Sequence, residues 1–493
     1  MFKKILFYLL ALLLLTSSWA FAEYNQAPEF EEQVQEGNLP EIEDRLPENP
    51  KTIEVDSTGD YGGTLNSIST RAISWGEDNM LMDPANLVVA EADGGGVETE
   101  LAEKIESNED KSVWTFHLRE GVKWSDGEPF TAEDILFWYE RVILNEDLTP
   151  VVGPAWKAEG EVVEVSVIDD YTVEFSYAGP KPYLPYRLVH ETIYYPKHYA
   201  KNFHPDYVEE EKLEEMMDEE DFDNWWELFN DKAGIWSASL LGTIPVTNPD
   251  LPTLAPYVLV DQSSDRRIYE RNPYYWKVDD AGNQLPYIER IDTNIVNDRE
   301  VVNGKIMSGE VDFAGFETDI RNYPMFRNYE DEGGYRTLTW TSGMGSDVIY
   351  MVNQTSEDEN LREIFQEKEF RQALSLAIDR DEINESIYFG RGEPRQYTVI
   401  EGSRYFEEEF AKSNIEFDPE RAEELLDEIG LKDQNGDGVR ELPNGEEFTF
   451  TVEFYPSETP KAPNVELVIE HWKDIGIDVN SKQVSGELQE QRA

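Results

Sequence analysis

The side chains best suited to proton transfer, nucleophilic attack or metal binding are present in this sequence, but their spacing supports none of these chemistries. The five histidines are His117, His190, His198, His204 and His471. None belongs to a His-Glu-x-x-His motif, and no Gly-x-Ser-x-Gly elbow or phosphate-binding glycine loop occurs. Among 104 acidic residues, neighbouring carboxylates arise by chance and do not indicate glycosidase chemistry. We therefore predict no catalytic residue and no cofactor.

One loop resembles the start of a calcium-binding motif. Asp433, Asn435 and Asp437, followed by Gly438, match the first ligand positions of an EF-hand loop. The twelfth position is Asn444, where a bidentate glutamate is needed. We interpret the loop as a turn between a helix and a strand and predict no metal site, with weak calcium binding in brine as the alternative.

The charge of the chain limits its partners and indicates a saline habitat. The formal net charge is −62, from 42 Lys+Arg and 104 Asp+Glu. Nucleic-acid binding requires clustered basic residues, and an anionic membrane surface repels an acidic protein, so we predict no nucleic-acid partner. The acids are spread along the chain, in runs such as 209–211 and 218–221. Molar salt screens such self-repulsion, which predicts a halophilic protein; an ordinary acidic secreted protein is the alternative.

The first 22 residues have the pattern of a secretory signal peptide. Lys3 and Lys4 precede an apolar stretch over 5–15, and an Ala-x-Ala site predicts cleavage after Ala22. The chain has no cysteine, which excludes disulfides and the lipid-bearing cysteine of a lipoprotein. We expect a protein that is free in the periplasm and monomeric.

The remaining pattern predicts an α/β protein. Residues 23–50 are acidic and rich in proline, and predict an extended leader or linker. Thr131 and Asp134 have capping-box spacing at the start of a helix over 132–143. Further helices are expected in an acidic insertion near 207–230 and over 359–389, 419–429 and 463–474. Strands are expected within 112–124 and over 161–168, 171–177, 256–262, 266–270, 288–296, 335–341, 447–455 and 476–482.

Several stretches carry a family resemblance. The longest is 114–135, which begins Trp-Thr-Phe-His-Leu-Arg-Glu-Gly-Val-Lys-Trp-Ser-Asp-Gly. Others cover 272–277, 308–313 and 370–380. In this order they resemble the extracellular solute-binding proteins of bacterial ABC importers, in the oligopeptide- and dipeptide-binding class (family 5 type). The resemblance covers nearly all of residues 60–485.

The resemblance implies a two-lobed periplasmic-binding-protein fold with mixed sheets. The first lobe, 51–348, would be split into two subdomains, and the chain would cross to the second lobe, 349–493, along a strand over 348–353. Relatives continue well past the equivalent of Ala493, so the C-terminal end is expected to be truncated and the second lobe incomplete. The family's loop with an aspartate that grips a peptide amino group has no counterpart among the residues present.

The function implied by the resemblance is capture of a small solute by lobe closure and its delivery to the membrane subunits of an ABC importer. An oligopeptide is the expected ligand, an oligosaccharide is the alternative, and a secreted halophilic glycoside hydrolase is a remote one. A glycine lets a ligand approach the backbone closely, and aromatic rings offer apolar contact with a polar tip. On these grounds the candidate ligand-binding residues are Gly63 with the adjacent Thr64, Trp75, Trp340 and Tyr350. Asn353, at the presumed lobe crossing, is a further candidate that could bond either the ligand or the hinge backbone, and ordinary packing is the alternative for all six.

Overall fold

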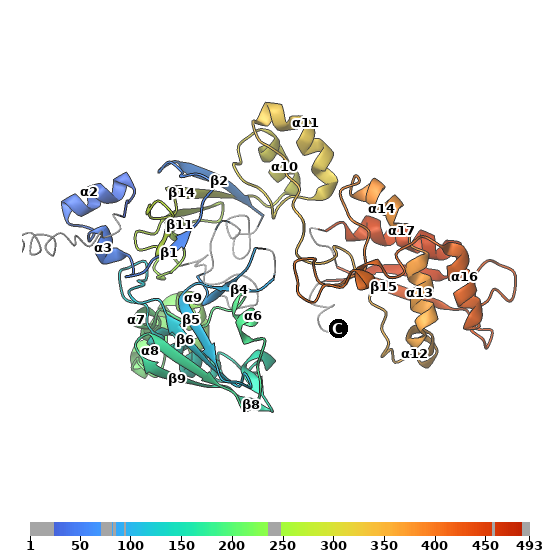
Figure 1. Ribbon diagram of the computed structural model, residues 1–493, viewed down its shortest axis with the longest axis horizontal. Coiled ribbons are helices and arrows are strands. Elements are labelled where there is room, and N and C mark those ends of the chain that lie inside the picture. Colours follow the sequence, from blue (N-terminus) through green and yellow to red (C-terminus); the bar gives the residue numbers. More distant parts are fainter. Residues whose placement is uncertain are drawn as a thin grey trace, which may run out of the picture. The chain divides into compact units, whose positions relative to one another are not determined.

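The computed structural model describes residues 24–70, 81, 85–92, 95–234, 248–455 and 459–485. The chain divides into two compact units (Figure 1). Unit 1 consists of Met1–Ala90 and Val97–Ile295, and unit 2 of Glu91–Gly96 and Val296–Ala493. The predicted lobe boundary between 348 and 349 stays a prediction.

The described residues of unit 1 form two four-stranded sheets and three short strand pairs. The first sheet is antiparallel, in the order β5 Ala102–Ser107, β6 Val113–Leu118, β10 Thr172–Ser176 and β9 Glu164–Asp169. The second has the order β11 Tyr257–Gln262, β12 Arg266–Arg271, β14 Arg290–Ile295 and β2 Thr64–Ser69, with only its last pair parallel. The pairs are β1 Lys51–Ile53 with β13 Lys277–Asp279, β3 Val88–Ala90 with β4 Val97–Thr99, and β7 Lys157–Ala158 with β8 Glu161–Val162.

Strand β6 forms where large apolar residues occupy every second position of the sequence. Its apolar members Trp114, Phe116 and Leu118 are buried, whereas the residues between them are partly exposed. The Phe116 ring meets Phe175 of β10 edge-on at 5.5 Å between centroids, which holds two strands of the sheet together. The strand ends before Gly121, whose φ of 88° suits a turn that only glycine makes at low cost. The alternation therefore reflects packing of this sheet against the core.

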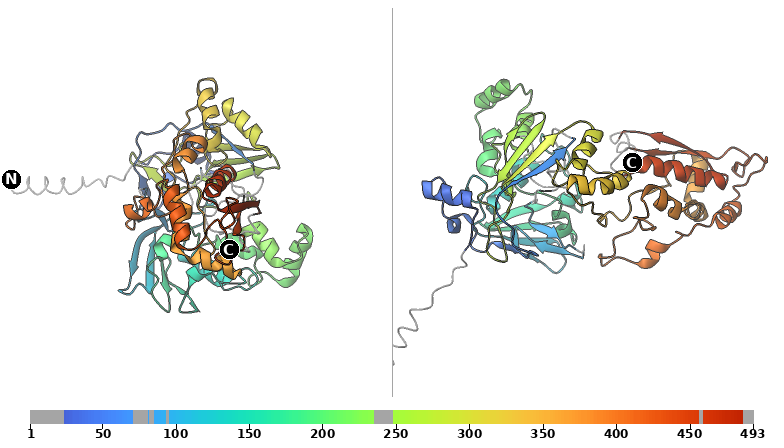
Figure 2. Two further views of the ribbon diagram at one scale, coloured as in Figure 1. Left: turned by 90° about the vertical axis from the view of Figure 1, so that its right-hand side faces the viewer. Right: turned by 90° about the horizontal axis from the view of Figure 1, so that it is seen from above.

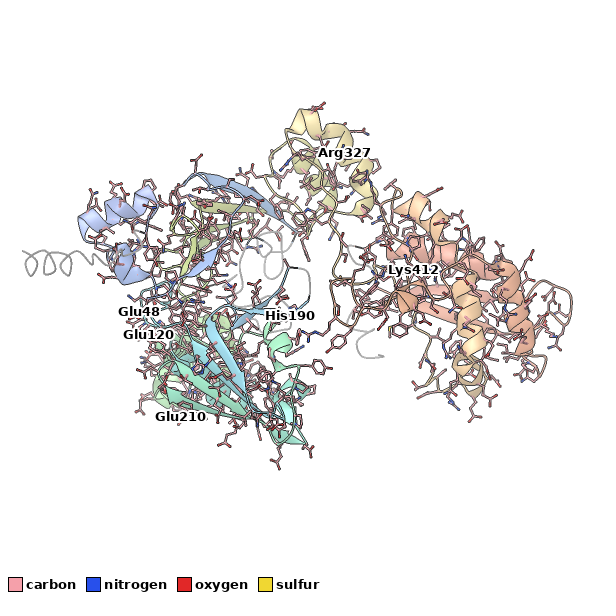
Figure 3. The ribbon with its side chains drawn as sticks, viewed as in Figure 1. Glu48, Glu120, His190, Glu210, Arg327 and Lys412 are labelled. Carbon is pink, nitrogen blue, oxygen red and sulfur yellow. The ribbon has the colours of Figure 1, made fainter. Side chains whose placement is uncertain are left out.

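The helices of unit 1 are short. They are α2 Pro28–Glu36, α3 Ile42–Arg45, α5 Ala132–Phe137, α6 Leu184–Leu188, α7 Lys197–Ala200, α8 Glu210–Glu220 and α9 Trp225–Ala233, with 3-10 turns at Pro154–Trp156 and Lys201–Phe203. The predicted helix over 132–143 is present, but Trp138–Ile143 is a π-helix. The predicted acidic insertion forms α8 and α9, and α8 (green) lies at the periphery of its unit in both views of Figure 2. Glu210, at the start of α8, is on the outside of the unit in Figure 3.

The stretch 23–50 contains structure that its composition does not predict. Helices α2 and α3 form there, with Pro28 at the first position of α2 and Gly37 in the left-handed conformation at its end. Phe30 is buried beneath Arg45 and Arg271, whose guanidinium groups lie 5.2 and 5.7 Å from its ring centroid. These tertiary contacts outweigh the polar composition of the segment, so part of it packs on unit 1 and is not extended.

The capping box at the start of α5 is confirmed and makes a pH-dependent contribution to stability. The Asp134 carboxylate accepts the backbone N–H of Thr131 at 2.9 Å and that of Lys197 at 3.0 Å. Burial nevertheless raises the pKa of the Asp134 carboxyl to about 6. Because an unfolded aspartate titrates near 3.9, the folded state holds a proton that the unfolded chain releases between these two pH values.

We therefore expect this carboxyl to add stability as the pH falls from above 6 to below about 4, by up to about 3 kcal/mol. Asp134→Asn should remove that part of the pH dependence. The check is the urea midpoint of both proteins between pH 4 and 7 in molar salt, which screens the surface carboxylates. Parallel pH profiles for the two proteins would contradict the assignment.

In its described residues, unit 2 combines helices with one parallel strand pair. The helices are α10 Arg299–Met307, α11 Tyr323–Gly333, α12 Glu359–Gln366, α13 Lys368–Leu376, α14 Arg380–Ile387, α15 Glu408–Lys412, α16 Pro419–Glu428 and α17 Lys461–Asp474, with a 3-10 turn at Ile320–Asn322. The pair is β15 Thr449–Phe454 with β16 Asp478–Gln483. The core of unit 2 includes Phe370, Leu426, Val468 and Trp472 from α13, α16 and α17. The predicted helices and strands after residue 359 are present, but the helical stretch 359–389 is divided into α12, α13 and α14, and α15 was not predicted.

Two predicted strands are wrong. Neither 335–341 nor 348–353 is a strand in the described part of the chain. Their aromatic and β-branched residues favour extended backbone, but a strand also needs a neighbour that supplies hydrogen bonds. Between them Gly345, with a φ of 75°, turns the chain in a way that interrupts an extended run. In the described part of the molecule, no helix is both long and apolar enough to cross a membrane.

Candidate functional site

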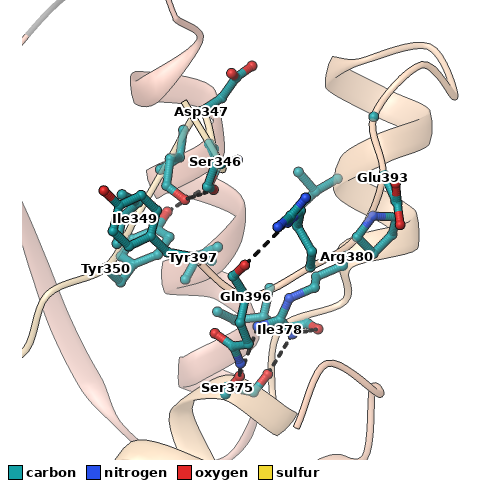
Figure 4. Close-up of a pocket in the computed structure, with 18 of the residues that line it drawn as sticks. Ser346, Asp347, Ile349, Tyr350, Ser375, Ile378, Arg380, Glu393, Gln396 and Tyr397 are labelled. Carbon is teal, nitrogen blue, oxygen red and sulfur yellow. Dashed lines mark hydrogen bonds between the residues drawn. The ribbon is translucent and has the colours of Figure 1, made fainter. Parts of the chain in front are cut away.

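The candidate site is a pocket of about 970 Å³ in unit 2. One wall is the irregular segment 339–354, and the opposite wall consists of α13, the start of α14 and the loop 388–397 (Figure 4). Ile320, Ser413, Asn414 and residues of α17 complete the lining. The pocket therefore joins segments that are separated in the sequence but belong to one compact unit.

Aromatic residues form an apolar part of the lining. Tyr350 stands edge-on to Trp472, with 5.3 Å between ring centroids, and its hydroxyl donates a hydrogen bond to Asn464 Oδ1 at 2.7 Å. The Trp472 indole N–H donates to the Leu374 carbonyl at 2.9 Å, which links α17 to α13. Burial raises the pKa of Tyr350, so its phenol stays neutral. These residues provide a rigid apolar surface with satisfied polar groups.

A polar cluster lies on the opposite wall. The Ser375 hydroxyl accepts from Gln396 Nε2 at 2.7 Å and from Arg380 Nη2 at 2.8 Å, while the Ser375 carbonyl accepts from Arg380 Nη1 at 2.9 Å. Figure 4 shows these side chains meeting at the end of α13. Burial lowers the pKa of the Arg380 guanidinium. The cluster holds the loop 388–397 against the helices and so shapes the pocket.

The structure describes five of the six candidate residues and places them in different surroundings. Trp340 and Tyr350 line the pocket, and Trp340 is 73% exposed. Asn353 stands between the lining residues Val352 and Gln354 but is not part of the lining, and its Oδ1 accepts from the backbone N–H and hydroxyl of Thr355 in a local turn. Its ligand contact stays a prediction.

Gly63 and Thr64 belong to unit 1. Gly63, with a φ of 78°, precedes Thr64, the first residue of β2, and its carbonyl accepts from the N–H groups of Glu289 and Arg290. These contacts give Gly63 a structural role at the entry to the sheet, while its contact with ligand stays a prediction. Trp75 lies outside the described residues.

Sequence reasoning did not select Arg391, Arg395 and Gln396, which line the pocket. A usable signal was present, because two arginines flank Gly392 and Pro394 in a short loop of a very acidic chain. The sequence-based prediction of ligand contacts favours aromatic over charged residues and therefore omits the loop 388–397.

The loop after α16 brings three acidic side chains together. Carboxylate oxygens of Asp433, Asp437 and Glu441 all lie within 4.8 Å of one another. Asp433 accepts the N–H groups of Gly436 and Gly438 at 2.6 and 2.9 Å, and these bonds lower its pKa. The loop thus has the hydrogen bonds of the predicted turn.

Comparison with known proteins identifies the family. The family model described as bacterial extracellular solute-binding proteins, family 5 Middle, matches residues 96–493. The periplasmic alpha-galactoside-binding protein of Rhizobium meliloti (strain 1021) is 28% identical over 469 residues, which are 86% of this chain and 62% of that protein. The periplasmic oligopeptide-binding protein OppA of Salmonella typhimurium is 26% identical over 405 residues, 77% of this chain and 61% of that protein. The chain thus spans less than two thirds of these relatives' lengths.

Solved structures agree in fold. An oligopeptide-binding protein OppA superposes with a TM-score of 0.76 at 37% identity, over 97% of this chain and 74% of that one. The periplasmic binding protein MelB from Agrobacterium fabrum C58, in complex with stachyose, has a TM-score of 0.65 at 23% identity, over 96% of this chain and 72% of that one. The predicted fold class, the α/β fold of two-lobed periplasmic binding proteins with mixed sheets, is confirmed. The chain belongs to the family 5 bacterial extracellular solute-binding proteins.

Proposed function

We propose that this protein captures a small solute in the pocket of unit 2 and delivers it to the membrane subunits of an ABC importer. The observation that carries the proposal is the pocket itself, with an aromatic surface on one side and the polar cluster of Ser375, Arg380 and Gln396 on the other. Its volume of about 970 Å³ suits a ligand of several residues or sugar rings. Contact of a ligand with both lobes would favour the closed arrangement.

The ligand that we propose first is an oligopeptide. The 37% identical solved relative is named as an oligopeptide-binding protein, as is the Salmonella relative. An oligosaccharide is the second candidate, favoured by the alpha-galactoside-binding relative and by the exposed rings of Trp340 and Tyr397, on which a sugar could stack. Both ligand classes would use the same pocket.

We further propose that the protein is not an enzyme. Glycoside hydrolysis needs two carboxyl groups that face each other across the scissile bond. In the described lining the carboxylates are Asp347 and Glu393, and Glu393 is paired with Lys412 at 2.9 Å. This arrangement favours binding without turnover. Release of reducing sugar in molar salt would refute it.

The proposed setting is the periplasm of an organism from a saline habitat. The signal peptide would be removed after Ala22, and the mature protein would be a monomer. Because 104 acidic residues repel one another at low ionic strength, we expect the urea midpoint to rise between about 0.1 and 2 M NaCl. A midpoint that stays constant or falls would argue against adaptation to salt, and N-terminal sequencing of the secreted protein checks the cleavage site.

Ligand binding can be tested by thermal unfolding of the full chain in molar salt. A ligand present at 100 times its dissociation constant should stabilise the folded state by about 2.7 kcal/mol. We expect this shift with tri- to pentapeptides. A shift with galactose-containing oligosaccharides and none with peptides would instead assign the second ligand class, and no shift with either would contradict the proposed function.

A further inference from the structure

The segment 24–53 lies across the join between the two four-stranded sheets of unit 1. We call it the N-terminal strap, and it contains α2, α3 and β1. Its helices (blue) lie at the edge of unit 1 in Figure 1 and in Figure 2. The strap touches the connection between β12 and β14 of one sheet and the region around β5 and β6 of the other.

Contacts along its whole length attach the strap to the connection between β12 and β14. The Asn25 N–H donates to the Gly282 carbonyl at 3.0 Å, and the Asn25 carbonyl accepts the N–H of Gln284 at 2.8 Å. Arg45 is fully buried, and its guanidinium donates to the Pro273 carbonyl and to Gln284 Oε1. Strand β1 pairs in parallel with β13, which belongs to the same connection. The strap thus binds this region at its start, its middle and its end.

Polar contacts also attach the strap to the sheet that contains β5 and β6. The Asn49 carbonyl accepts from Arg119 Nη1 at 2.5 Å, and Asn49 Nδ2 donates to Glu103 Oε1 at 3.0 Å. The Glu48 N–H donates to the Glu120 carbonyl at 3.3 Å, and Figure 3 shows these two residues side by side. Since the strap binds both regions, it fastens one sheet to the other.

The strap packs through small apolar clusters of its own. Phe30 and Leu39 belong to one cluster, and Ile42 and Leu46 belong to another with Val278. Neither cluster includes a residue of the large core around β6 and β10. Segments that bury little apolar surface open at a lower free energy than the core. The strap can therefore detach while the core of unit 1 stays intact.

The strap is strongly acidic. It carries eight Asp+Glu against two Lys+Arg, a net charge of −6 in a chain of net charge −62. Over the described residues, Glu29 is the only acid of the strap with a cationic group within 4 Å, the guanidinium of Arg271. Docking therefore brings the other seven carboxylates, without a paired cation, onto an acidic protein.

Like charges meet where the strap touches the sheet that contains β5 and β6. Burial raises the pKa of the Tyr171 hydroxyl, and the carboxylates of Glu120, Asp170 and Glu48 raise it further, so all three act on one phenol. Glu48 belongs to the strap, and the other two belong to the region of the sheet. Salt weakens such repulsion between exposed charges, since the Debye length falls from about 10 Å at 0.1 M to about 3 Å at 1 M.

We propose that the N-terminal strap is a salt-dependent clamp, which fastens the two sheets in molar salt and detaches at low ionic strength before the core of unit 1 unfolds. Hydrogen bonds and apolar clusters favour the docked strap at every salt concentration, whereas repulsion opposes it only when the charges are poorly screened. Detachment would also remove β1 from β13, which carries Lys277 of the buried pair with Glu100. The inference rests on the proposed adaptation to salt and assigns part of it to one segment.

Hydrogen exchange of the full chain, followed by mass spectrometry from about 3 M to about 0.1 M NaCl, tests this proposal. An unstructured reference peptide corrects for the effect of salt on the intrinsic exchange rate. We expect the amides of α2 and α3 to lose protection by about tenfold or more at a salt concentration where those of β6 and β10 stay protected. Equal salt dependence of the strap and the core would overturn the clamp.

Neutralising part of the strap should keep it docked at lower salt. The variant combines three changes of exposed residues: Glu31→Gln, Glu32→Gln and Glu48→Gln. Because it halves the net charge of the strap, it should lower the salt midpoint of strap detachment by about twofold or more. The matched control makes the same change of charge on exposed residues of α8: Glu214→Gln, Glu215→Gln and Glu219→Gln. It should leave the midpoint unchanged, and an equal shift in both variants would overturn the assignment to local repulsion.

Arg45→Gln tests the attachment itself. It removes the guanidinium that joins the strap to Pro273 and Gln284, so the strap should lose protection at every salt concentration while β6 keeps its own. A strap that stays protected in this variant would overturn the clamp. A urea midpoint of the whole chain that rises with salt, together with strap protection that does not, would overturn the clamp and leave the adaptation to salt in place. Loss of both salt effects would overturn the two proposals together.

Discussion

Replacing Lys277 by alanine is expected to destabilise unit 1 by about 3–5 kcal/mol. Lys277 Nζ lies 2.8 Å from Glu100 Oε2, and both side chains are only 6% exposed. The ammonium group also lies 5.0 Å from the centroid of the Trp276 ring, which is fully buried. Without Lys277, the Glu100 carboxylate would lose this ion pair in a site that water hardly reaches, with Arg119 as a remaining neighbouring cation. The loss of one partner from a buried ion pair is among the most costly defects in a folded protein.

The double variant Lys277→Met with Glu100→Gln tests this explanation. Because it removes both charges and keeps most of the volume, it should recover most of the lost stability. The measurement is urea unfolding followed by tryptophan fluorescence, with hydrogen exchange of β13 to localise the effect to unit 1. Lys104→Ala is the control, since Lys104 pairs with Glu106 on the surface, and it should change stability by no more than about 1 kcal/mol. A double variant as unstable as the single one would contradict the account.

Replacing Trp472 by alanine is expected to destabilise unit 2 by about 3–5 kcal/mol. Trp472 is 2% exposed and packs against Tyr350 and Phe450, at 5.3 and 6.1 Å between ring centroids. Its indole also donates the hydrogen bond that ties α17 to Leu374. The substitution leaves a cavity and removes this bond. Trp472→Phe keeps most of the apolar contact and should cost less.

Trp340→Ala is the matched control within the same pocket. Trp340 is 73% exposed, so its removal should change stability by less than about 0.5 kcal/mol. If Trp340 contacts the ligand as predicted, the same variant should weaken binding while the unfolding midpoint stays constant. The comparison therefore distinguishes Trp472, which stabilises the folded pocket, from Trp340, which we expect to contact the ligand. Equal losses of stability for the two alanine variants would contradict this division.

Elements with strong local signals could be predicted from the sequence. Asp418 caps α16 by accepting the N–H of Arg421 at 2.9 Å, Pro419 occupies the first helical position, and Gly430 follows the helix with a φ of 84°. Each of these preferences depends on a few neighbouring residues. For the same reason the alternation of β6 and the capping box of α5 were predicted correctly.

Elements that depend on distant partners were predicted less well. The segment 348–353 has the composition of a strand, yet Tyr350 bonds to Asn464 through its side chain and the backbone joins no ladder. Helix α2 lies in a segment whose composition indicated a linker, because Phe30 finds a buried site. The π-helix at Trp138–Ile143 follows α5 directly. The spacing of apolar residues in the sequence does not distinguish this π-helix from an α-helix. In each case the deciding contact lies outside the local sequence.

The candidate site also combines residues that the sequence selected with residues that only the structure brought together. The sequence selected Trp340 and Tyr350, which line the pocket, by residue type alone, and it did not select the arginines opposite them. Arg391 and Trp340 belong to segments separated by the helices α12, α13 and α14, so their common cavity depends on how α13, α14 and α17 pack.

By itself, then, the sequence determined the family, the acidic surface, the export signal as an expectation, and those helix and strand boundaries that rest on local preferences. The tertiary structure alone decided which side chains share a cavity and that, in a chain with net charge −62, the charged residues lining the pocket are mainly basic. The physical reason is that hydrogen-bonding and conformational preferences act between near neighbours in the chain, whereas burial and electrostatic environment are set by residues brought together only by packing.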